Sequence, residues 1–144
     1  DSSVLSFYVT TVWDEVPNTD PIIGIVAGVP GSDTDRVNSD YQNAFTLNGD
    51  TEYATRRSSY TTGAYNDWTF NSSGLSYISK TGLTRLGVRH GDDIDNSEPS
   101  ISSGAQRQTG IAYYAADQTG TSQDPKLVVE HSASATFIPR IIMY

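Results

Sequence analysis

The feature that most constrains the fold of this chain is its division into short apolar runs, each bounded by residues that favour turns. Runs such as Val4–Trp13 and Ile22–Ala27 are rich in β-branched and aromatic residues, which suit a pleated, half-buried sheet. Ser, Thr, Gly, Asn and Asp fill the intervals and are typical of tight turns. In the first run, alternation predicts that Leu5, Phe7 and Val9 share one face of a strand.

The same pattern predicts further strands and one short helix. In the segment 64–70, alternation puts Asn66, Trp68 and Phe70 on one face. A helical turn is expected around Leu75 and Ile78, with Ser72 or Ser73 as its cap and Gly82 as its end. Other expected strands are 45–47, 52–60, 83–88, 111–116, 126–131 and 136–144. About seven or eight strands with one short helix indicate an all-β fold, a single jelly-roll-like β-sandwich.

Length and charge limit the organisation and the partners. A chain of 144 residues is typical of one domain, so we expect a β-sandwich domain over residues 1–132 and a C-terminal apolar strand or extension over 133–144. The formal net charge of −8 argues against binding to nucleic acid or to anionic lipid. No apolar run approaches the roughly 20 residues of a membrane-spanning helix. The absence of cysteine and the scarcity of lysine favour an extracellular protein or a subunit of an assembly, with Asp1 as a processed terminus or the start of a fragment.

An acidic loop is expected from Gly91 to Pro99. Its carboxylates are candidate ligands for a structural Ca²⁺, which takes six to eight oxygen ligands, although the spacing does not fit an EF-hand. The alternative is a solvated acidic loop that keeps the protein soluble. The candidate metal ligands are Asp92, Asp93, Asp95 and Glu98.

Aromatic residues indicate a second candidate site. Tyrosine presents a flat apolar face with a polar tip, which suits stacking on sugars or on a protein partner. The candidate ligand-binding tyrosines are Tyr41, Tyr53, Tyr60 and Tyr65; the alternative is that they cover the edges of the sheets. We expect Trp13 and Trp68 in the core.

Catalytic patterns are hard to assemble from these residues. A Ser-His-Asp arrangement would need His90 or His131, and the sequence has no G-x-S-x-G motif around a nucleophile. It also lacks the glycine-rich loops that bind nucleotide cofactors. We therefore predict no catalytic residue and no cofactor beyond a possible Ca²⁺, and a polysaccharide-degrading domain is only the third alternative.

Three segments in order along the chain resemble the DNRLRE-type jelly-roll domain. Residues 4–9 are similar to its "ATLRLYV" strand, residues 68–78 to its "W-x-x-F-D-V" strand and the following short helix, and residues 124–129 to its closing "P-x-L-x-V" strand. The middle of the chain is also similar to C-terminal β-sandwich modules of phage structural proteins and large bacterial surface proteins. The resemblance implies an adhesive or architectural β-sandwich that is extracellular, on the cell surface or in a virion, and it implies no catalytic residues.

This sequence departs from that family at both ends. Two or so strands that the family places before the strand of Leu5 are missing, and the chain continues for a dozen residues after His131. That continuation is apolar and would promote association if it were exposed, and Pro139 places it at the edge of a sheet or in a crossing between sheets. It either folds back onto its own sandwich or inserts into a neighbouring chain. The candidate assembly interface consists of Phe137, Ile138, Ile141, Ile142 and Tyr144.

Together these observations predict a non-enzymatic structural or adhesive subunit, such as part of a surface filament, a decoration protein or a tail protein. Its partners would be identical subunits, in a homo-oligomer or a polymer. The alternative is a carbohydrate-binding module with a stacking face of tyrosines, a structural calcium and a polysaccharide ligand.

Overall fold

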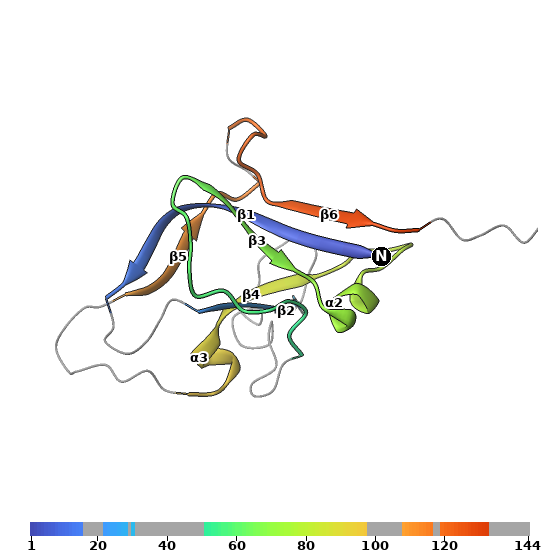
Figure 1. The fold of residues 1–144 in the computed structure, drawn as a ribbon, viewed down its shortest axis with the longest axis horizontal. Coiled ribbons are helices and arrows are strands. Elements are labelled where there is room, and N and C mark those ends of the chain that lie inside the picture. Colours follow the sequence, from blue (N-terminus) through green and yellow to red (C-terminus); the bar gives the residue numbers. More distant parts are fainter. Residues whose placement is uncertain (16–21, 29, 31–50, 98–107, 117–118, 133–144) are drawn as a thin grey trace, which may run out of the picture.

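A computed structural model describes residues 1–15, 22–28, 30, 51–97, 108–116 and 119–132. In these residues, antiparallel strands form two sheets, accompanied by two short helices (Figure 1). The larger sheet contains β1 (Ser2–Asp14), β3 (Ala64–Thr69), β5 (Thr109–Tyr113) and β6 (Lys126–Glu130), and the smaller contains β2 (Ile23–Ala27) and β4 (Leu86–His90). The helices are α2 (Ser72–Tyr77) and α3 (Gly91–Ile94). The all-β character predicted from the sequence is confirmed.

β1 is the central strand of the larger sheet. Along one edge it pairs with β3, from Val4 to Val9. Along the other edge, β6 pairs with the first half of β1, from Ser2 to Ser6. β5 pairs with the second half of that edge, from Val9 to Asp14. One long strand therefore aligns three shorter strands that lie far apart in the sequence.

The hydrophobic core lies between the two sheets. Leu5 and Phe7 of β1 meet Ile25 of β2 and Trp68 of β3 in one buried cluster. Trp68 is fully buried, its ring packs edge-on against Phe7 with centroids 5.5 Å apart, and its indole N–H donates to the Ile23 carbonyl at 3.1 Å. The predicted core faces of both strands are thus confirmed, because strict alternation sends every second side chain to the same side of a sheet.

Trp13 differs from its predicted position. It is half-buried and lies outside the core cluster. The register between β1 and β5 shifts between Val9 and Thr11, as in a β-bulge. The extra residue reverses the alternation, so Val12 lies opposite the partly buried Ile111 and Trp13 falls on the outer face. The expectation of a core position for Trp13 was wrong for this reason.

Both helices begin at caps that the sequence analysis missed. The side chain of Asn71, rather than of Ser72 or Ser73, accepts a hydrogen bond from the Gly74 N–H at 2.9 Å, and α2 ends at Tyr77. α3 occupies part of the expected acidic loop, and its first turn is capped by His90, whose Nδ1 accepts from the Asp92 N–H at 3.2 Å.

Other expected strands are shorter or displaced. Residues 52–60 form only isolated bridges, at Ala54 and Arg57. The strand expected at 83–88 is β4, and the strand expected at 111–116 is β5, which begins two residues earlier. The expected strands at 45–47 and 136–144 lie outside the described residues.

Candidate functional site at the open edge of β6

β6 exposes a run of aliphatic side chains. Leu127, Val128 and Val129 are 42%, 53% and 43% exposed, and every residue of this strand is exposed. Within the described part of the chain, β6 pairs with β1 and with no other strand. An apolar strand with one unpaired edge is a typical template for the addition of another strand.

The hydrogen bonds that β1 makes on the side of β3 show which way the backbone groups of β1 point. The Ser3 carbonyl accepts from the Phe70 N–H at 2.9 Å, and the Val9 carbonyl accepts from the Gly63 N–H at 2.8 Å. The odd-numbered residues in the first half of β1 therefore direct their backbone groups toward β3. In an antiparallel sheet, the backbone N–H and C=O groups of successive residues point to opposite edges of the strand. The backbone groups of the even-numbered residues therefore point toward β6.

This alternation identifies the free backbone groups of β6. Val128 is paired with Val4, so its backbone groups face β1; the Ser3 hydroxyl also donates to the Val128 carbonyl at 3.0 Å. The N–H and C=O groups of Leu127 and Val129 consequently point away from β1. Leu127 lies opposite the buried Leu5, so the side chains of Leu127 and Val129 lie on the core face.

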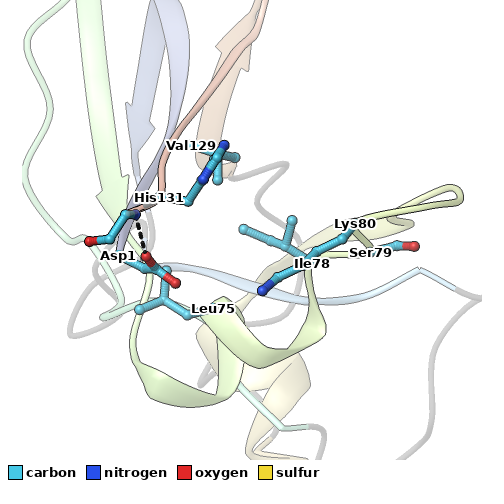
Figure 2. A pocket seen from close by; sticks show the side chains of 8 residues that line it. Asp1, Leu75, Ile78, Ser79, Lys80, Val129 and His131 are labelled. Carbon is cyan, nitrogen blue, oxygen red and sulfur yellow. Dashed lines mark hydrogen bonds between the residues drawn. The ribbon is translucent and has the colours of Figure 1, made fainter. Parts of the chain in front are cut away.

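A groove of about 560 Å³ adjoins this edge, between α2 and the end of β6 (Figure 2). Its apolar walls are Leu75 of α2, Ile78 directly after α2, and Val129 of β6. The Ser132 N–H donates to the Asp1 carboxylate at 2.9 Å and so holds the chain beyond β6 against the start of β1. The remaining lining residues are Asp1, Ser79, Lys80, His131 and Ser132.

α2 is fixed in place beside the groove by close packing. A Cβ atom at position 74 would clash with the Tyr53 carbonyl oxygen, so the close approach of α2 to Tyr53 requires Gly74. The Asn71 side chain donates to the Glu52 carbonyl at 2.8 Å, and Leu75 and Ile78 also pack against the core. These contacts fix the position of the groove wall that α2 provides.

In the acidic segment, Asp95 is engaged by an arginine. Its two carboxylate oxygens accept from the Arg56 guanidinium at 2.6 Å each, and Glu52 accepts from the same guanidinium at 2.7 and 2.8 Å. Hydrogen bonding by Arg56 lowers the pKa of Asp95, and the bonds to Asp95 and Glu52 raise the pKa of Arg56. This network joins the segment after α3 to residues 52–56.

The other predicted calcium ligands are not gathered around a common point. Asp93 accepts from the Arg89 guanidinium at 2.7 Å. Asp92 has a buried carboxylate oxygen without a hydrogen-bond partner, 3.7 Å from His90. Among the residues the structure describes, no group of three acidic or histidine side chains has the geometry of a metal site. Glu98 lies outside those residues, so the calcium site stays a prediction.

The ion pair of Asp95 predicts a pH dependence of stability. A carboxyl group whose pKa is lowered by folding stabilises the fold fully above its unfolded pKa of about 3.9, and this stabilisation is lost as the pH falls through the folded-state pKa. We expect Asp95→Asn to reduce the urea midpoint at about pH 7, and the difference from the native chain to shrink progressively as the pH falls below about 3.9. Asp14→Asn, at the exposed end of β1, is the control; an Asp95→Asn deficit that stays constant with pH would contradict the assignment.

The tyrosines predicted to bind a ligand lie in different parts of the structure. Tyr53 is buried and stacks on Tyr77, with ring centroids 4.3 Å apart. Tyr60 packs against the core and donates to the Arg57 carbonyl, and burial raises its pKa to about 12. Tyr65 lies opposite Tyr8 in the sheet, on the face away from the core. The three described tyrosines therefore do not share one face, and Tyr41 lies outside the described residues.

Tyr65 belongs instead to an aromatic cluster that the sequence analysis missed. Its ring meets Tyr8 edge-on with centroids 5.4 Å apart, and Tyr8 stacks on Tyr114 at 5.9 Å. The Tyr65 hydroxyl donates to the carbonyls of Ser122 and Asp124, both at 2.9 Å. Alternation in β1 already places Tyr8 opposite to the core face, but its partners depend on the strand register.

The two histidines occupy unrelated places. His90 caps α3, and His131 lines the groove beyond β6. The predicted assembly residues Phe137, Ile138, Ile141, Ile142 and Tyr144 all lie in 133–144, outside the described residues, so the predicted boundary at 132 is not tested.

Comparison with known proteins yields no relative. No family model, no curated protein and no solved structure matches this chain. None of the helices in the described residues has the length and apolar character that crossing a bilayer requires.

Proposed function

We propose that this chain is a non-enzymatic structural or adhesive subunit, with a jelly-roll-like fold, of an extracellular or virion-associated assembly. Its C-terminal segment 136–144 makes the contacts between subunits. The observation that carries the proposal is the open edge of β6, where three consecutive aliphatic residues are exposed and the last of them, Val129, lines a groove with apolar walls.

The exposed run has an energetic cost that association would remove. Burying apolar surface contributes about 25 cal/mol per Å², and a monomer gains nothing from leaving this strand in water. The segment 136–144 has a single charged residue, Arg140, and is equally unfavourable in water. An open apolar edge and an apolar segment in the same chain are complementary, because one supplies free backbone groups and the other supplies a strand to pair with them.

The proposal predicts that the full chain self-associates and that a chain ending at Ala135 does not. Deletion of residues 136–144 removes the linking strand, so we expect the solution mass measured by light scattering to fall to that of one chain of about 15 kDa, since 144 residues weigh 15.6 kDa. A full-length variant, Ile141→Asp, provides the same test without shortening the chain, because a charge in the linking strand opposes its burial.

One observation supports the alternative that this chain is a carbohydrate-binding module. The cluster of Tyr8, Tyr65 and Tyr114 on the outer face of the larger sheet has the aromatic character of a sugar-stacking surface. If the full chain is a monomer that polysaccharide retards in native gels, the assembly proposal fails and a carbohydrate-binding module takes its place.

A further inference from the structure

We propose that the open edge of β6 accepts residues 136–144 of a second copy of this chain as a parallel strand, with the groove beside α2 holding its last apolar side chains. This inference rests on the proposed function and specifies the site that receives the linking segment. It follows from the directions of the backbone groups in β6 and from the pattern of the segment.

Arg140 and Thr136 distinguish the two faces that the segment 136–144 would have as a strand. Its odd-numbered positions, Phe137, Pro139, Ile141 and Met143, are all apolar, whereas its even-numbered positions hold Thr136 and Arg140 together with Ile138, Ile142 and Tyr144. In a strand, these two sets point to opposite faces. The odd-numbered set therefore suits the core face, where Leu127 and Val129 are left exposed.

Pro139 decides between the two possible directions of this strand. In an antiparallel pair, residues on the core face would direct their backbone groups at Leu127 and Val129, and Pro139 has no N–H to donate. In a parallel pair, residues on the core face direct their backbone groups away from β6. Only the parallel arrangement puts the odd-numbered side chains on the core face and also turns the backbone of Pro139, which has no N–H, away from β6.

A parallel strand next to β6 must come from another molecule. Joining two adjacent parallel strands within one chain takes a crossover of about a dozen or more residues. Only the three residues 133–135 separate Ser132 from the segment.

Charge and length suggest the register. Glu130 is exposed on the outer face at the end of β6, and placing Arg140 beside it puts Phe137 beside Leu127 on the core face. Ile141 and Met143 then extend past the end of β6, by up to about 13 Å for four residues. The groove lined by Leu75 and Ile78 begins at that end, next to Val129 (Figure 2).

The arrangement links the copies head to tail. The segment leaves its own subunit beyond Ser132 and enters the next subunit at the Lys126 end of β6. Such a contact joins two different surfaces, so it generates a ring if the rotation closes and a filament if it does not.

The test uses full-length chains and light scattering. Val129→Pro removes one outward N–H group of β6 and leaves the bonds to β1 intact, so we expect loss of assembly. The matched control is Val128→Lys, because Val128 is at least as exposed but lies on the outer face with its backbone groups toward β1; this variant should assemble like the native chain. Val129→Lys repeats the test without a proline, and circular dichroism checks that each variant folds.

Cysteine cross-linking tests the partner and the face, on a chain that has no cysteine of its own. A Leu127→Cys chain mixed with a Phe137→Cys chain should form a disulfide between the two chains under mild oxidation, whereas Leu127→Cys mixed with Ile138→Cys should not. If the native chain is monomeric, the proposed function fails together with this inference. If the native chain assembles but folded Val129→Pro and Val129→Lys assemble equally well, or the cross-link forms at Ile138 instead, the acceptor site is wrong while assembly stands.

Discussion

Replacing Trp68 with alanine is expected to destabilise the fold by about 3–5 kcal/mol, the range for large aromatic residues in a core. The side chain is fully buried between the two sheets, and it contacts Phe7 and donates to the Ile23 carbonyl. Its removal leaves a cavity at the point where β1, β2 and β3 meet, and the Ile23 carbonyl keeps only its hydrogen bond from the Arg57 N–H. Urea unfolding followed by circular dichroism measures the change in the free energy of unfolding.

Trp13→Ala is the matched control for that experiment. The same side chain is removed, but Trp13 is half-buried on the outer face after the bulge. We expect a clearly smaller loss of stability than for Trp68→Ala. Equal losses for the two variants would contradict the reversal of the strand faces that the bulge produces.

Asn66→Ala is expected to cost about 3 kcal/mol, because it removes three hydrogen bonds that each contribute about 1 kcal/mol. Asn66 is 2% exposed, and its amide donates to the carbonyls of Thr61 and Ala64 at 2.9 and 3.0 Å. Its side-chain oxygen accepts from the Thr61 N–H at 2.8 Å. The side chain therefore holds the turn that leads into β3.

The control for Asn66→Ala is Asn71→Ala, measured by the same urea unfolding. Asn71 is exposed and caps α2, and loss of such a cap typically costs about 1 kcal/mol. If the two variants were equally destabilised, the buried network of Asn66 would not have the importance that its hydrogen bonds indicate.

The buried face of a strand was predictable from the sequence, because side chains two residues apart lie on the same face. The buried faces of Leu5, Phe7 and Val9 and of Asn66, Trp68 and Phe70 follow from alternation alone. The helix caps were harder to predict, because α3 uses an imidazole nitrogen of His90 in place of the usual Ser, Thr, Asp or Asn. The position of Trp13 could not be predicted, because one extra residue in a strand moves every later side chain to the opposite face of the sheet.

The candidate site was only half predictable. The apolar character of 136–144 is visible in the sequence, but the exposed edge of β6 is not, since Leu127, Val128 and Val129 have the composition of a buried strand. Their exposure depends on which strand lies on each side of β6, and that is set by pairing with Ser2–Ser6, far away in the sequence. The arginine that engages Asp95 was missed for a similar reason, because in sequence Arg56 lies 39 residues from Asp95.

The position of β1 at the centre of the larger sheet has a consequence for the order of folding. Its partners come late in the chain, and the contact between Ser2 and Glu130 closes a separation of 128 residues. Such long-range pairings are slow, because the entropy of closing a large loop is lost before the contacts form. During synthesis, β1 is made well before β6, and until β6 emerges the edge of β1 that it will cover is open to strands of other nascent chains.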